Sequence, residues 1–161
     1  MQCEPQKEHA WLANLVGDWA ITSECVMGPD QPTQTMKGRE TVRLLGELWA
    51  IGEGEMEMPG GDQPGKTMIT IGFDPSAGGY VGTWIGSMMT KLWVYKGEMD
   101  AAGRTLALHA EGPSFTDPNK TAKYKDVIEL VDKDLRRFSS HLMGEDGKGM
   151  QFIKAEYRPV K

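Results

Sequence analysis

Apolar and polar residues alternate along most of the chain, in short runs separated by turn-forming residues. Alternation with a period of two is typical of strands that bury one face. Clusters of Asp, Gly and Pro separate the runs roughly every eight to twelve residues, as in an antiparallel meander. The ten runs cover residues 18–27, 35–45, 48–58, 66–73, 80–87, 91–99, 104–111, 122–131, 135–143 and 150–158.

The start of the chain follows a helical period instead. Pro5 suits a first helical position, Glu8 favours the first turn, and Gly17 ends the segment. We therefore predict one helix over about residues 5–16. It is too short to be stable alone, so it should cap another part of the fold. Its apolar face consists of Trp11, Leu12, Leu15 and Val16, of which Trp11 and Leu15 are expected to turn inward.

No second helical segment is present to connect parallel strands, so the strands should pair antiparallel in sequence order. An open sheet of ten strands would leave two long exposed edges, and closure into a barrel removes both. We predict an all-β protein with one domain over residues 1–161, in which residues 17–158 form a ten-stranded up-and-down barrel capped by the helix. Such a barrel has room for a small ligand unless its own large side chains fill it.

The alternation also assigns faces within strands. Trp19 should close the bottom of the core, because a buried tryptophan contributes several kcal/mol. Three glutamates share one face of the third run, and mutual repulsion favours the solvated exterior for them. The alternative is that Glu53 points inward and pairs with Lys125, Lys154 or Arg43 across the lumen. These glutamates are Glu53, Glu55 and Glu57, and the residues that share a face with Trp19 are Ile21, Ser23, Cys25 and Met27.

Composition narrows the class of protein. The 161 residues include 18 Lys and Arg against 23 Asp and Glu, a net charge of −5, which disfavours nucleic acid and anionic membranes as partners. Cys3 and Cys25 do not form a disulfide framework. The chain has no signal-peptide pattern and no apolar run of about 18 residues, so we expect a cytoplasmic protein without a membrane span.

No catalytic motif is present. The sequence has neither a Gly-x-Ser-x-Gly elbow nor a His-Glu-x-x-His pair, and Gly65-Lys66-Thr67 precedes a strand rather than the helix that a phosphate loop requires.

Several segments resemble one known family over most of the chain. The helix sequence His9-Ala10-Trp11-Leu12 leads into Gly17-Asp18-Trp19, and similar spacing continues to the end. The pattern resembles the DUF1579 family, small bacterial proteins of unknown function. The further segments are Ile71-Gly72-Phe73-Asp74, where Phe replaces the family's Tyr, the Tyr80–Ser87 run with Trp84, Gly97–Leu106, Tyr124-Lys125-Asp126 and Glu156-Tyr157-Arg158-Pro159. The resemblance implies a calycin-like barrel akin to lipocalins, fatty-acid-binding proteins and haem-binding nitrobindins, and it supplies no activity.

Barrel closure and this resemblance together lead us to expect a binding protein for an apolar or amphipathic small molecule. The 11 methionines suit a soft lining that adapts to its ligand. The apolar contacts that we predict are Trp84, Met88, Trp93, Tyr95 and Phe138, and the polar anchors are Ser87, Lys125, His141 and Glu156.

The sequence is also compatible with three other kinds of function. The resemblance to nitrobindins makes His141 a candidate haem ligand, because neutral imidazole is a usual axial ligand of haem iron. An enzyme could use the same cavity. A third hypothesis is a structural or interaction role with a filled lumen, and a homodimer through an exposed sheet face is compatible with the sequence.

Overall fold

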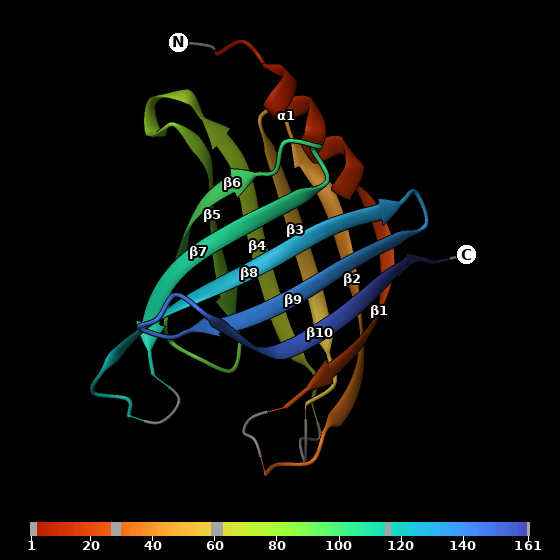
Figure 1. The fold of residues 1–161 in the computed structure, drawn as a ribbon. Coiled ribbons are helices and arrows are strands. Elements are labelled where there is room, and N and C mark those ends of the chain that lie inside the picture. Colours follow the sequence, from red (N-terminus) through yellow and green to blue (C-terminus); the bar gives the residue numbers. More distant parts are fainter. Residues whose placement is uncertain (1–2, 27–29, 59–62, 115–116, 161) are drawn as a thin grey trace.

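The computed structural model describes residues 3–26, 30–58, 63–114 and 117–160 and consists of a short helical segment followed by ten strands (Figure 1). The α-helix α1 covers Lys7–Trp11 and continues as a 3₁₀-helix, Leu12–Leu15. The strands are β1 Gly17–Cys25, β2 Gln34–Leu45, β3 Trp49–Met56, β4 Gly65–Asp74, β5 Gly79–Gly86, β6 Trp93–Met99, β7 Thr105–Pro113, β8 Thr121–Asp132, β9 Leu135–Met143 and β10 Gly149–Pro159. A 3₁₀-helix, Pro75–Ala77, lies in the turn between β4 and β5.

The strands form one closed antiparallel barrel. Each strand pairs with the next in sequence, and β1 pairs with β10 from Trp19 opposite Pro159 to Cys25 opposite Ile153. Because β2 occupies the other side of β1, neither the first nor the last strand is left as an edge. The predicted fold class is therefore confirmed.

The strand boundaries agree closely with the predicted runs. No strand end differs from its predicted run by more than two residues. Differences of two residues occur at the C-terminal ends of β1, β3 and β7 and at the start of β6, which begins at Trp93 rather than Lys91. Met27, predicted to continue the inner face of β1, lies outside the described residues, as does the predicted turn at residues 59–62.

The helical segment closes one end of the barrel, as predicted, although it begins at Lys7 rather than at Pro5. His9 bridges the segment to the barrel, because its Nδ1 accepts from Gln6 N–H and its Nε2 lies 2.9 Å from the carbonyl oxygen of Phe73. Trp11 Nε1 donates to the carbonyl oxygen of Gly103 at 2.7 Å. Figure 1 shows α1 over this end and the longer loops at the opposite end. None of the described helices is long and apolar enough to cross a membrane.

Alternation correctly predicts which side chains enter the barrel. Along β1, every second residue from Trp19 to Cys25 is buried. Trp19 lies at the capped end, where its Nε1 donates to the carbonyl oxygen of Leu15 at 2.9 Å. In the helical segment Leu12 and Leu15 are buried, whereas Val16 is 43% exposed and does not join the apolar face predicted for it.

Close contact between β4 and β5 requires glycine at residue 82. A Cβ at Gly82 would lie 2.3 Å from the carbonyl oxygen of Thr70, a backbone atom that cannot move without disturbing the pairing. We expect Gly82→Ala to lower the free energy of unfolding by about 1–3 kcal/mol, as for other overpacked sites, in urea denaturation. The matched control is Gly144→Ala, whose Cβ would approach mainly the flexible carboxylate of Asp146. An equal loss in both variants would show that the contact at Gly82 is not the cause.

Candidate functional site

The barrel is hollow on one side and solid on the other. A cavity of about 450 Å³ is lined by residues of β1 to β5 and β8 to β10, with Leu15 of the helical segment at its closed end. No residue of β6 or β7 lines this cavity. The solid side is filled by large side chains, among them Tyr80, Tyr95, Leu106 and Leu108. The hypothesis of a filled lumen therefore describes only half of the interior.

Apolar side chains form most of the cavity wall. Ile21, Val42, Ala50 and Ile71 line the part near the helical segment. The opposite end, where the strands lead into the longer loops, is lined by methionines. Their unbranched, polarisable side chains adapt to ligands of different shape. These methionines are Met36, Met56, Met58 and Met88.

A buried ion pair lies on the cavity wall near the capped end. Arg136 of β9 donates from Nη2 to Oε1 of Glu40 on β2 at 2.7 Å, and the two side chains are only 5% and 12% exposed. The guanidinium carbon also lies over two rings, 4.7 Å from the centre of Trp19 and 4.5 Å from that of Tyr157. These cation–π contacts help to hold the guanidinium beside Glu40.

Tyr157 adds a hydroxyl group to the same wall. It pairs with Arg136 across β9 and β10 and lines the cavity. Burial raises the pKa of Tyr157 above its ordinary value, and the nearby Glu40 carboxylate acts in the same direction. The hydroxyl is therefore a neutral donor and acceptor, and no other described residue forms a hydrogen bond with it.

A second buried carboxyl group lies deeper in the solid part of the barrel. Asp126 of β8 accepts from Tyr95 Oη at 2.5 Å and from Ser140 Oγ at 2.6 Å. Burial raises the pKa of Asp126 although both hydrogen bonds lower it. Asp126 does not line the cavity. Its two hydrogen bonds therefore link β6, β8 and β9 and do not form part of a ligand site.

The raised pKa of Asp126 predicts a pH dependence of stability. The folded protein holds this proton more tightly than the unfolded chain does. The stabilisation is therefore complete below the unfolded pKa, near 3.8, and is lost as the pH rises through the folded pKa. Asp126→Asn cannot titrate, so its stability relative to the wild type should improve steadily as the pH rises from acid to neutral. Urea denaturation across this range, with Asp134→Asn in an exposed turn as control, tests this. A difference that does not change with pH would contradict it.

Three of the nine predicted site residues line the cavity. Trp84, Met88 and Phe138 contribute to its wall. Tyr95 is buried beside it and is bound to Asp126. Trp93 packs at right angles to Tyr124, with ring centres 5.2 Å apart, in the solid part of the barrel.

The four predicted polar anchors lie away from the cavity. Lys125 and His141 are paired neighbours on the outer face of β8 and β9. Glu156 forms an ion pair with Arg158 at 3.1 Å on the outer face of β10. Ser87 is exposed after β5, where its Oγ accepts from Lys66 N–H at 2.9 Å. These residues were selected for their chemistry, whereas their strand positions direct them outward.

The histidines do not fit the haem hypothesis. His141 Nε2 lies 2.9 Å from Ser139 Oγ, and both residues are on the outer face of β9. His109 contacts Glu98 on the exterior, and both ring nitrogens of His9 are engaged at the capped end. No histidine of this chain lines the lumen.

The polar groups that do reach the cavity, Arg136, Glu40 and Tyr157, are not among the predicted site residues. Extending the inner face of β9 from Phe138 by two residues gives Arg136, so the alternation contained a usable signal. Likewise, Glu40 lies two residues before the buried Val42 on β2, so both side chains are on the inner face. Glu53 and Glu55 are exterior as predicted, paired with Arg43 at 3.6 Å and with Lys66 at 3.9 Å. Glu57, predicted to lie with them, instead contributes to the open end of the cavity just after β3.

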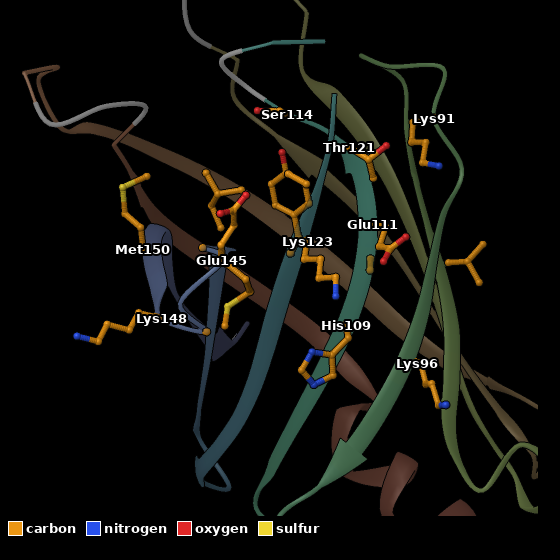
Figure 2. Close-up of a pocket in the computed structure, with 18 of the residues that line it drawn as sticks. Lys91, Lys96, His109, Glu111, Ser114, Thr121, Lys123, Glu145, Lys148 and Met150 are labelled. Atoms are coloured by element: carbon orange, nitrogen blue, oxygen red, sulfur yellow. The ribbon is translucent and has the colours of Figure 1, made fainter. Parts of the chain in front are cut away.

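A larger hollow of about 1280 Å³ lies at the ends of β6 to β8 and beside the turn between β9 and β10, and its lining combines outward-facing side chains with Ala110 and Tyr124 from the inner face. Figure 2 shows Lys96, His109 and Lys123 on neighbouring strands in this groove, with Glu111 above them. Exposed, charged side chains form much of its wall, so it remains open to water. The lumen is less open and has a more apolar wall, so we take the lumen as the candidate site.

Several solved structures are similar to this barrel over almost the whole chain. The S-type phycobiliprotein lyase CPES from Guillardia theta has a TM-score of 0.59 and 15% identity, covering 98% of this chain and 99% of that one. Rv2717c from M. tuberculosis has a TM-score of 0.61 and 10% identity, covering 98% and 100%. EF1p2_mFAP2b, solved bound to DFHBI, has a TM-score of 0.50 and 14% identity, covering 95% and 99%. At such low identities the similarity establishes the fold alone.

The sequence itself gives one match. Residues 4–159 match the family described as "Protein of unknown function (DUF1579)". No curated protein matches the sequence significantly.

Proposed function

Because the chain belongs to the DUF1579 family, whose description assigns no function, we propose from its own geometry that it binds an apolar or amphipathic small molecule in the barrel lumen. The observation that carries this proposal is the cavity of about 450 Å³ inside the barrel, which is open at one end and has mainly apolar walls. This volume falls in the range of about 300–1,000 Å³ that is typical of small-molecule sites.

The two ends of the cavity have different roles in this proposal. The helical segment closes one end, so a ligand enters between the loops at the other end. The methionines there, including Met36 and Met88, give way as the ligand passes and then pack against it. The neighbour EF1p2_mFAP2b holds the small molecule DFHBI, which supports the capacity of this architecture for a guest.

The apolar wall sets the scale of affinity. At about 0.8 kcal/mol for each buried CH₂ group, a ten-carbon chain gains about 8 kcal/mol. The loss of translational and rotational freedom removes at least about 4 kcal/mol of this. At most about 4 kcal/mol remains, which corresponds to a dissociation constant of about 1 mM or weaker for the chain alone. A larger apolar ligand buries more surface and should bind more tightly.

Titration with the uncharged fluorescent probe N-phenylnaphthylamine tests the proposal. We expect a saturable rise in fluorescence with one site per chain, and unlabelled decanol should displace the probe. Lys123→Ala in the outer groove should leave the titration unchanged. A probe signal that does not saturate, or that depends on Lys123, would overturn the proposal.

A further inference from the structure

The charges that line the lumen do not include a spare cation. Arg136 is the only positively charged side chain among the described lining residues, and Glu40 already neutralises it at 2.7 Å. Glu57 lies at the open end and adds a negative charge. A carboxylate entering this cavity would therefore be buried without a cation of its own to neutralise it, which is unfavourable.

The same wall has hydrogen-bonding capacity that the protein itself does not use. The guanidinium of Arg136 has one described acceptor, Oε1 of Glu40. The Oε2 atom of Glu40 faces Gly52 on the cavity wall, where a Cβ would come within 3.0 Å of it. The Tyr157 hydroxyl has no described partner. These donors and acceptors line the lumen, so they suit a ligand that both donates and accepts.

We propose that Arg136, Glu40 and Tyr157 form a subsite at the capped end of the lumen for the uncharged polar end of an amphipathic ligand, such as a hydroxyl or primary amide. This inference rests on the proposed function and names its ligand class. The ion pair presents a donor and an acceptor side by side with no net charge, so a neutral group forms hydrogen bonds there without burying a new charge. The absence of a side chain at Gly52 lets the carboxylate of Glu40 pack against β3, where a Cβ would lie 3.0 Å from Oε2.

Competition for bound N-phenylnaphthylamine tests the ligand class. Decanol, decanamide, decanoate and decylamine share one chain length and differ only at the end. At neutral pH we expect decanol and decanamide to displace the probe at concentrations at least about tenfold lower than decanoate and decylamine. Probe binding together with equal or tighter binding of either charged ligand would overturn the inference while leaving the proposed function intact. Absence of any saturable probe binding would overturn the proposed function itself.

A neutral ligand also leaves water more easily than an ion does, so variants must show that the subsite causes the preference. Glu40→Gln leaves Arg136 with an uncompensated positive charge, and we expect decanoate to gain at least about tenfold relative to decanol. Glu53→Gln on the outer face of β3 should leave the ratio unchanged. Tyr157→Phe should weaken decanol binding about three- to tenfold without weakening the probe. An unchanged decanoate-to-decanol ratio in Glu40→Gln would contradict the subsite.

A second variant keeps the test informative if Glu40→Gln does not fold. Glu40→Leu combined with Arg136→Met replaces the ion pair by apolar side chains of similar size, a change that proteins often tolerate. This protein should still bind the probe, but decanol should lose its advantage over decyl chloride, which has the same chain and no hydroxyl. Retention of that advantage would place the polar end of the ligand elsewhere.

Discussion

Arg136→Ala is expected to lower the free energy of unfolding by about 3–5 kcal/mol. The substitution leaves the carboxylate of Glu40, which is 12% exposed, without its cation in the barrel interior. It also removes the group that lies over the rings of Trp19 and Tyr157. Both losses act in the same direction, so this should be among the most destabilising single changes in the chain. Chemical denaturation in urea measures it.

The matched control is Arg43→Ala. Arg43 pairs with Glu53 at 3.6 Å, but these side chains are 56% and 55% exposed. An exposed pair contributes about 0–1 kcal/mol, so this variant should be close to the wild type. Equal effects of the two substitutions would mean that the pair between Arg136 and Glu40 is not buried as described.

Ser23→Phe is expected to lower the affinity for N-phenylnaphthylamine at least about tenfold. Ser23 is buried, lines the cavity and lies opposite Ala155, whose small side chain leaves room for a ring in the lumen. The ring would occupy space that the ligand needs. Filling a cavity commonly stabilises a protein by about 0.5–2 kcal/mol, so the loss of binding should not accompany unfolding.

Thr22→Phe provides the control, because Thr22 is the preceding residue on β1 and is exposed on the outer face. It introduces the same ring into the same strand without entering the lumen. Fluorescence titration should distinguish the two variants clearly. Equal affinity of Ser23→Phe and Thr22→Phe for the probe would show that the probe binds outside the barrel.

The order and nature of the strands were predictable because their information is local. A strand such as β7 shows its inner face in Leu106, Leu108 and Ala110, and turn residues mark its ends. Closure also followed from sequence, since sequential antiparallel pairing of ten strands leaves edges that only a barrel removes.

The site was less predictable because closure brings distant residues together. Glu40 and Arg136 are 96 residues apart, and charged residues are usually assigned to the exterior. Which half of the barrel is solid depends on how Tyr95, Tyr124 and Trp93 pack across the interior, and alternation does not specify this packing. His141 and Lys125 were selected by residue type, although their strand positions indicated the outer face.

The most direct test of the lumen as a binding site is a crystal structure of the protein with a brominated decanol, in which the bromine is on the carbon farthest from the hydroxyl. Anomalous scattering locates the bromine without reference to the rest of the density. We expect one bromine among the methionines at the open end of the lumen, near Met36 and Met88, with the chain extending toward Arg136. Bromine bound only on the outer surface, with the lumen free of ligand, would contradict the claim that this barrel holds a guest.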